Sequence, residues 1–311
     1  MSRCVLITGG SGFLGSNLAK AMADAGWTVH VATRGRVASE RLMTLCSDAK
    51  LHDLDLAGPA DAIVASIAAL RPDAIVHCAA YGVDYRENDP SQAIAVNVQG
   101  ASALVLAAAS ASVSRFVHIG TSSEYGIADG AITESTPLHP AGVYGSTKAA
   151  GLVVARERAR SLGLSFIAAR AFGMYGPLEG GHKFVPQVMQ AAREGMTIEL
   201  TPGGQVRDYT YVGDIADACV AMADGGGGDD RIVNLASGRP LTLRQLGDAA
   251  AFAAGGGADL RWGAQTYRPA EPMSVLADPS LARSLLSWEA TTPLADGMAQ
   301  TAHYEKFRSR T

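Results

Sequence analysis

Short apolar runs alternate along this chain with longer segments in which apolar residues recur at helical spacing. The runs are CVLIT (4–8), TVHVAT (28–33), AIVHCAA (74–80), RFVHIG (115–120) and SFIAARAF (165–172). Between them lie alanine-rich segments such as 92–112, whose apolar positions repeat every three or four residues. Strands of a parallel sheet are buried on both faces and read as continuous apolar runs. The pattern therefore predicts an α/β fold with a doubly wound parallel sheet covered by helices.

The alternation of strand and helix breaks after residue 170. Glycine and proline cluster at YGPLEGG (175–181), TPGG (201–204), GGGG (225–228) and AAGGGA (253–258), which predicts surface turns. A chain of 311 residues is long enough for two coupled domains. We therefore expect a doubly wound domain at 1–170, completed by a segment around 207–235. A smaller, loop-rich domain is expected at 171–206 and 236–311.

Composition and charge narrow the class of ligand. Charged residues make up 18% of the chain, the net charge is −4, and Lys and Arg form no block, so nothing indicates nucleic-acid binding. The four cysteines lack Cys-x-x-Cys spacing, which favours reduced thiols and a cytoplasmic setting; they are Cys4, Cys46, Cys78 and Cys219. The seven histidines show no metal-ligand spacing, and no uninterrupted apolar stretch reaches the roughly 18 residues of a membrane span. A small molecule is the expected ligand, with no metal and no membrane.

A glycine-rich loop follows the first predicted strand and opens a helix. Gly9, Gly12 and Gly15 form a Gly-x-x-Gly-x-x-Gly pattern, and Phe13 and Leu14 lie between the last two glycines. Glycines let the chain turn sharply and let a pyrophosphate approach the backbone, while the helix N-terminus offers free N–H groups and a positive dipole end. In this strand–loop–helix setting the pattern predicts a dinucleotide site that includes all five residues.

The end of the second predicted strand indicates which dinucleotide binds there. An acid at this place would accept a hydrogen bond from the ribose 2′-hydroxyl of NAD, whereas an arginine pairs with the 2′-phosphate of NADP. The chain has Thr33 there, followed by Arg34 and Arg36. We therefore expect NADP(H) as the preferred cofactor, with NAD(H) as the second choice. The alternative is that the two arginines only solvate a surface loop.

Two groups of polar residues are candidates for the chemistry. Tyr144 and Lys148 lie four residues apart and share a face of a predicted helix, where an ammonium lowers the pKa of a nearby phenol from about 10 and makes it a usable proton donor or acceptor. Thr121, Ser122 and Ser123 stand at the end of another predicted strand, where ligands of doubly wound sheets bind and where a hydroxyl would share the charge on a reacting oxygen. The alternatives are an exposed helix face for the first group and a capping or turn role for the second.

Together these motifs resemble the extended short-chain dehydrogenase/reductase family, in its nucleotide-sugar epimerase/dehydratase/reductase branch. The segments that carry the resemblance are TGGSGFLG (8–15), HCAA (77–80), AVNVQG (95–100), TSSEYG (121–126), Tyr144-x-x-x-Lys148, RAFGMYGP (170–177) and RDYTYVGD (207–214). They span nearly the whole chain. The resemblance implies a Rossmann domain that holds a nicotinamide cofactor and a smaller C-terminal domain that binds a nucleoside-diphosphate sugar.

The same resemblance implies roles for individual residues. It makes Thr121, Tyr144 and Lys148 the catalytic triad. The cofactor contacts are Asp53, Leu54, Ala79, Ala80, Asn97, Tyr144 and Lys148, with Lys148 holding the ribose and Asp55 as an alternative register for the adenine-contacting Asp53. It places substrate contacts at Ser122, Ser123, Tyr144, Gly173, Arg207 and Arg268. The two arginines fall where relatives contact the diphosphate, with which arginine forms bidentate pairs; a surface salt bridge is the alternative for either.

Two departures from the family pattern bear on the reaction. Sugar 4,6-dehydratases carry an acid within two positions after the catalytic Thr, where this chain has Ser122 and Ser123, and Glu124 comes one position late. Water elimination is therefore not expected. Gly173 stands where the family's Arg-x-x-Asn-x-Tyr-Gly-Pro segment has Asn, so the position is retained but the contact of the Asn side chain with the substrate is absent.

These observations favour an NADPH-dependent reductase of the C4 keto group of a nucleoside-diphosphate 4-keto-6-deoxyhexose. Tyr144 would protonate the C4 oxygen, Thr121 would hydrogen-bond it, and Lys148 would tune the phenol. The first alternative is an NAD-dependent nucleotide-sugar epimerase with the same triad, and a remote one is a non-catalytic NADP-sensing binding protein. By analogy with the family, we also expect a homodimer that pairs through the helices around 92–112 and 146–160.

Overall fold

Seven parallel strands form the main sheet of the computed structural model, which describes residues 3–84, 86–128, 130–269 and 271–305. The strands are β1 (Cys4–Thr8), β2 (Thr28–Thr33), β3 (Lys50–Asp53), β4 (Ala74–His77), β5 (Arg115–Thr121), β7 (Phe166–Ala171) and β11 (Arg231–Leu235). Their order is β11-β7-β5-β4-β1-β2-β3, and every neighbouring pair is parallel. This doubly wound order confirms the predicted Rossmann-type fold.

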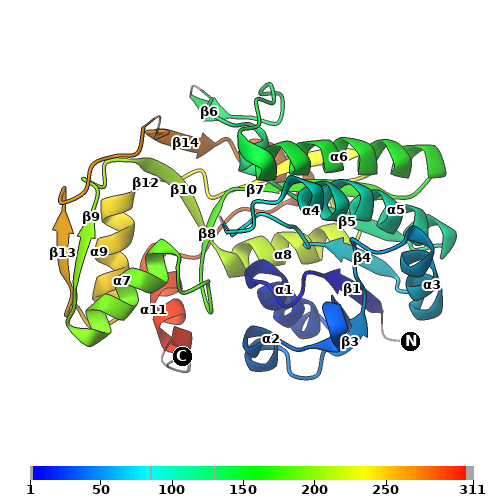
Figure 1. Ribbon diagram of the computed structural model, residues 1–311, viewed down its shortest axis with the longest axis horizontal. Helices are drawn as coiled ribbons and strands as arrows, with labels where there is room; N and C mark the ends of the chain where they lie inside the picture. Colours follow the sequence, from blue (N-terminus) through cyan, green and yellow to red (C-terminus); the bar gives the residue numbers. More distant parts are fainter. Residues whose placement is uncertain (1–2, 85, 129, 270, 306–311) are drawn as a thin grey trace.

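Helices cover both faces of the main sheet, as Figure 1 shows. The helices of one face are α1 (Phe13–Asp24), α2 (Glu40–Leu45) and α8 (Val212–Ala223); those of the other are α3 (Ala60–Leu70), α5 (Ala101–Ser110) and α6 (Gly142–Leu162). Successive residues of a strand face opposite sides, so Ile7 packs in the core of the first face and Leu6 in the core of the second. Both faces are buried, which explains why the strands read as continuous apolar runs.

The helical segment predicted at 92–112 is continuous but not regular. It consists of α4 (Pro90–Ile94), a π-helical turn labelled η2 (Ala95–Gly100) and α5. By length and composition alone, Pro90–Ser110 is apolar enough to cross a membrane, but half of its most apolar window is buried inside the protein. Because α5 packs between α3 and α6, it has the environment of a core helix, and the hydropathy carries no membrane assignment.

The remainder of the chain forms a smaller part with two short sheets. The first sheet contains β12 (Pro240–Thr242), β10 (Val206–Tyr211), β14 (Ser274–Ala277) and β6 (Ala131–Ile132), and β8 (Gly173–Tyr175) pairs with β10. The second pairs β13 (Asp259–Trp262) with β9 (Thr197–Leu200). The helices are α7 (Phe184–Glu194), α9 (Leu243–Ala253) and α11 (Leu294–Glu305), which share a separate core, and α10 (Ser280–Leu286), which packs on α8 and β11. After β10 the chain returns to the main sheet through α8 and β11, and the smaller part lies to the left in Figure 1.

Candidate functional site

The glycine loop between β1 and α1 is packed against the loop that follows β4. Gly9 has a left-handed φ of +69°, and a Cβ there would lie 2.7 Å from the backbone of Ala79. A Cβ at Gly15 would lie 2.3 Å from the carbonyl oxygen of Gly9, so α1 can approach the loop only without a side chain at Gly15. Gly12 caps α1 without a side chain, which leaves the first-turn N–H groups without a side-chain acceptor. These features fit the pyrophosphate of a dinucleotide.

Phe13 and Leu14 occupy the first turn of α1. Leu14 is buried in the core of the main sheet, so only its backbone faces the loop. Phe13 is partly buried and packs against the same core. Both residues therefore lie at the N-terminus of α1, the end of a helix that favours a phosphate.

A short 3₁₀ turn, η1 (Arg34–Arg36), carries the basic residues that follow β2. Thr33 is buried at the end of β2, and its hydroxyl has no hydrogen-bond partner in the described part of the chain. Arg34 and Arg36 are exposed and form no ion pair with any described residue. The N–H of Gly35 donates to Oδ1 of Asp53 over 2.7 Å, which ties the turn to the end of β3. The turn is therefore held by its backbone while both guanidinium groups stay available to an anion.

The residues predicted to surround the adenine lie at the end of β3 and directly after it. Leu54 is buried and donates its N–H to the carbonyl of Thr33. The Asp55 carboxylate accepts the N–H of Ala57 at 3.0 Å, so it serves a local turn. Asp53 rather than Asp55 therefore lies against the basic turn.

Asn97 links the loop after β4 to α6. Its Oδ1 accepts the N–H of Tyr81 at 2.8 Å, and its Nδ2 donates to the Tyr81 carbonyl and to the Thr147 hydroxyl, both at 2.9 Å. The side chain is buried and its amide is fully engaged within the protein. Asn97 therefore fixes the loop that contains Ala79 and Ala80 against the helix that carries Tyr144.

The three predicted catalytic residues meet at the carboxyl edge of the main sheet. Thr121 ends β5 and caps η3 (Ser122–Glu124), while Tyr144 and Lys148 lie one turn apart at the start of α6. Lys148 is 3% exposed, and its Nζ donates to the carbonyl of Ile119 on β5 over 2.7 Å. Tyr144 is partly buried next to Gly82.

Burial controls the protonation of Tyr144 in this structure. It raises the pKa of Tyr144 to about 12; a hydrogen bond with Thr121 opposes the rise and the charge of Glu124 adds to it. Burial lowers the pKa of Lys148, whereas Glu124 raises it. The predicted lowering of the phenol pKa by Lys148 is not seen in the protein alone, where the ammonium donates to Ile119. Tyr144 is therefore protonated at neutral pH, as a proton donor must be.

The acidic residue in the segment after Thr121, Glu124, is buried. Ser122 is partly buried and Ser123 is exposed, and the N–H of Ser123 donates to the Thr121 hydroxyl. Glu124 is fully buried and forms an ion pair with Arg170 at 2.7 Å. Hence this segment offers hydroxyl groups, and no free carboxylate, to a ligand.

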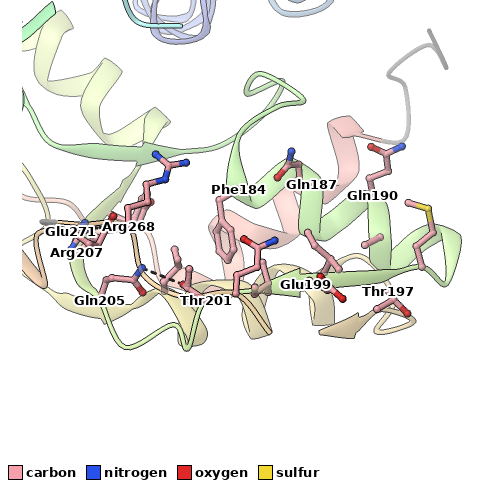
Figure 2. A pocket seen from close by; sticks show the side chains of 17 residues that line it. Phe184, Gln187, Gln190, Thr197, Glu199, Thr201, Gln205, Arg207, Arg268 and Glu271 are labelled. Atoms are coloured by element: carbon pink, nitrogen blue, oxygen red, sulfur yellow. Dashed lines mark hydrogen bonds and ion pairs between the residues drawn. The ribbon is translucent and has the colours of Figure 1, made fainter. Parts of the chain in front are cut away.

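A cavity of about 930 Å³ lies in the smaller part of the molecule and is shown in Figure 2. Arg207 on β10 and Arg268 both line it, and Arg207 forms an ion pair with Glu271 at 2.7 Å. Drug-sized ligands typically occupy pockets of about 300–1,000 Å³, so the cavity has room for a nucleotide. None of the triad residues lines this cavity. The structure thus gathers the predicted substrate arginines at one site and the triad at another.

Gly173 lies where β8 pairs with β10, opposite Tyr209. A Cβ at Gly173 would lie 2.8 Å from the carbonyl oxygen of Asp208 and 3.1 Å from the ring of Tyr209. Tyr209 also lines the large cavity. The aromatic ring therefore takes up the space next to the position where the family pattern has an asparagine.

Most residues that line the cavity were missed by the sequence reading. The missed residues with polar or aromatic side chains include Phe184, Gln187, Gln190, Thr197, Glu199, Thr201, Gln205, Gln265 and Glu271. They come from α7, β9 and the segments beside β10 and β13, which share no local motif. The one local signal was the YRPAEP segment, which contains both Arg268 and Glu271. Among the described residues, no group of three or more His, Cys, Asp or Glu side chains is arranged to hold a metal ion.

The seven-stranded parallel sheet and the glycine loop at its edge define a protein of the Rossmann-type α/β class. Residues 5–236 match the NAD dependent epimerase/dehydratase family, and the chain belongs to that family. A dTDP-glucose 4,6-dehydratase from Streptomyces griseus is 32% identical over 244 residues, 76% of this chain and 73% of that protein. A UDP-glucose 4-epimerase from Mycolicibacterium smegmatis is 29% identical over 320 residues, 98% of this chain and 99% of the relative. The solved UDP-glucose 4-epimerase of Thermus thermophilus, in complex with NAD, has a TM-score of 0.83 at 25% identity and covers 97% of this chain and 99% of its own.

Proposed function

We propose that this protein uses NADPH to reduce the C4 keto group of a nucleoside-diphosphate 4-keto-6-deoxyhexose. The observation that carries the proposal is the basic turn after β2, where the exposed Arg34 and Arg36 follow the buried Thr33. Guanidinium groups pair with phosphate, and the 2′-phosphate distinguishes NADP from NAD. A turn without a carboxylate at Thr33 lacks the acceptor that an NAD ribose would use.

The position of the acid after Thr121 supports reduction over elimination. Dehydration of a sugar needs a group that removes one proton and a group that protonates the leaving hydroxyl. Ser122 and Ser123 provide neither at neutral pH, and the carboxylate of Glu124 is buried against Arg170. Reduction of a ketone needs only one proton donor at the oxygen, which Tyr144 supplies.

In this proposal, the bound cofactor supplies the hydride for C4. Tyr144, with a pKa of about 12 in the protein alone, donates its proton to the C4 oxygen. Thr121 donates a hydrogen bond to the same oxygen, and Lys148 holds a positive charge near the phenolate that is formed. Arg207 and Arg268 bind the diphosphate from the cavity they line.

A nucleotide-sugar epimerase is the second candidate. It is favoured by the relatives, because one is a UDP-glucose 4-epimerase and the Thermus thermophilus structure contains NAD. Epimerisation at C4 would use the same Tyr144 alternately as base and acid, with no net use of cofactor. NAD that stays bound to the purified protein would support this function.

The decisive experiment mixes the purified protein with NADPH, or separately NADH, and a panel of nucleoside-diphosphate 4-keto-6-deoxyhexoses. Stoichiometric loss of NADPH with a new C4 hydroxyl in the NMR spectrum supports the reductase. A second NMR panel holds unreduced nucleotide sugars, and their interconversion without cofactor loss supports the epimerase. NADPH binding without turnover on either panel would indicate a non-catalytic protein. Tyr144→Phe should abolish turnover, whereas Tyr304→Phe on α11 is the matched control.

The proposal includes a homodimer in the cytoplasm. Helix α6 exposes Val153, Val154 and Leu162, and α4 exposes Ile94. Apolar side chains gathered on two packed helices suit a four-helix interface between two copies. Val153→Glu should shift the mass measured by light scattering from dimer to monomer, and a monomeric wild-type protein would refute the interface.

The cytoplasmic location in this proposal is supported by the cysteines: the four described cysteines are free thiols, as expected in a reducing compartment.

A further inference from the structure

Tyr209 on β10 lines the large cavity, and its hydroxyl has no hydrogen-bond partner among the described residues. Successive side chains of a strand point to opposite faces, so Tyr209 shares a face of β10 with Arg207, which lines the same cavity. Asp208 between them faces the other way, where its carboxylate accepts the N–H groups of Ser237 at 2.9 Å and Gly238 at 2.8 Å. A phenol without a partner therefore stands beside the predicted diphosphate contact at Arg207.

The strand register connects Tyr209 to the sheet edge that carries the triad. Thr121 at the end of β5 pairs with Ala171 at the end of β7. Two residues further along the chain, Gly173 on β8 pairs with Tyr209. β10 then continues directly into α8, which packs on β5. In a nucleoside-diphosphate sugar the two phosphates join the nucleoside to the sugar, so a substrate that reaches from the cavity to Tyr144 brings its phosphates past Tyr209.

Gly173 leaves free the space that the Tyr209 ring occupies. A Cβ at Gly173 would lie 3.1 Å and 3.3 Å from two carbons of this ring. The family pattern has an asparagine at this position, and its side chain contacts the substrate. An asparagine amide and the Tyr209 ring cannot both fit here, so the phenol stands where the amide would be. Amide and phenol both donate hydrogen bonds, so one polar group takes the place of another.

The hydroxyl of Tyr209 carries its proton at neutral pH. Burial raises the pKa of Tyr209 to about 12; the charges of Glu179 and Glu271 add to the rise, and that of Arg207 opposes it. Glu271 and Arg207 both line the large cavity, so the phenol is in the electric field of groups on the cavity wall. A phenol can donate to a phosphate oxygen, and hydrogen bonds to charged acceptors are stronger than those between neutral groups.

We propose that Tyr209 is a substrate-binding residue that takes over the contact of the missing asparagine. Its hydroxyl donates a hydrogen bond to the phosphate that is joined to the sugar, while Arg207 and Arg268 bind the diphosphate from the cavity. The hydroxyl thereby favours nucleoside diphosphates over monophosphates, which lack this phosphate. The inference rests on the proposed function for its class of substrate, and it applies to a reductase and to an epimerase alike.

The test is isothermal titration of wild type and Tyr209→Phe with UDP, dTDP and GDP and with the three matching monophosphates. Tyr209→Phe keeps the ring and breaks no hydrogen bond of the described protein, so the thermal midpoint should not change. The Kd of the diphosphate that the wild type binds most tightly should rise roughly 10- to 100-fold, whereas that of its monophosphate should change less than about twofold. Tyr211→Phe is the matched control, because its hydroxyl bonds Gln300 and it does not line the large cavity.

An unchanged Kd of the diphosphate in Tyr209→Phe would overturn this inference and leave the proposed function intact. Equal weakening of diphosphate and monophosphate would also overturn it, since the hydroxyl would then act on the nucleoside or on the inner phosphate. So would a similar loss in Tyr211→Phe, which would point to a change of β10 as a whole. A wild-type protein that binds none of the three diphosphates would contradict the nucleotide-sugar substrate itself, and the inference would fall together with the proposed function.

Discussion

The carboxylate of Asp53 accepts the backbone N–H of Gly35 at 2.7 Å and so joins the end of β3 to the turn between Arg34 and Arg36. Gly35 has a φ of +70°, a left-handed conformation that suits glycine. The bond fixes the turn without pairing Asp53 with either guanidinium. The two arginines therefore start from an ordered backbone, which reduces the entropy lost when an anion binds.

Removal of these arginines should change the cofactor preference. Arg34→Ala with Arg36→Ala is expected to raise the Kd for NADPH by roughly 10- to 100-fold, the range for losing hydrogen bonds to a charged group. The Kd for NADH should change little, because NADH has no 2′-phosphate. Isothermal titration of both cofactors measures the two effects. Arg283→Ala, which removes an exposed guanidinium paired with Glu289, is the control. Equal weakening of both cofactors would contradict a 2′-phosphate site.

The glycine loop gives a prediction about stability. Gly15→Ala should destabilise the fold by roughly 1–3 kcal/mol, because its Cβ would lie 2.3 Å from the Gly9 carbonyl and 2.7 Å from the Gly10 Cα. Gly12→Ala meets only the Gly9 carbonyl, at 3.2 Å, and should lower stability less while still hindering the cofactor. Denaturant unfolding of both variants separates these effects. A wild-type midpoint for Gly15→Ala would show that the loop and α1 can move apart freely.

The sequence allowed the fold to be predicted because the strands of the main sheet are buried on both faces. β1 and β2 begin and end at the predicted residues. The edge strand β3 lacks a continuous apolar run, and only the position of Asp53 indicated it in the sequence. Local motifs also placed Thr121, Tyr144 and Lys148 at one edge of the sheet. Contacts between distant segments had no such signal. Arg170 is 46 residues from Glu124, and the glycines at 225–228 fold partly around the buried guanidinium of Arg115.

We expect this chain not to tolerate an asparagine at Gly173, the position where the family pattern has one. The Cβ of Gly173→Asn would lie 2.8 Å from the backbone oxygen of Asp208 and 3.1 Å from the Tyr209 ring. We expect Gly173→Asn to lower the free energy of unfolding by roughly 1–3 kcal/mol and to restore no activity. Gly204→Ala, whose Cβ would meet the hydroxyl of Tyr267 at 3.1 Å, is the control. A stable Gly173→Asn protein with higher turnover would mean that β8 and β10 separate to admit the amide.

His118 should make the protein sensitive to acid. The side chain is buried, neither ring nitrogen has a hydrogen-bond partner among the described residues, and the ring lies 5.1 Å from that of His77. Burial, with smaller effects from Lys148 and His77, lowers the pKa of His118 well below 6.5. The unfolded chain therefore binds a proton at His118 that the folded protein does not bind. Stability must then fall as the pH drops below about 6.5 and recover as it rises.

His118→Phe should flatten this dependence. One titrating site changes the free energy of unfolding by at most about 1.4 kcal/mol per pH unit. Relative to the wild type, the free energy of unfolding of the variant should therefore rise by up to about 2–3 kcal/mol as the pH falls from 6.5 to 4.5. Phenylalanine breaks no hydrogen bond here and can pack against Phe166 as the imidazole does. Urea unfolding over this pH range measures the slope, with the exposed His139→Gln as the control. Parallel stability curves for wild type and His118→Phe would contradict the prediction. They would mean that the folded protein binds a proton at His118 as readily as the unfolded chain does. A buried charge without a partner is costly, and such a result would show that this cost is not met at His118.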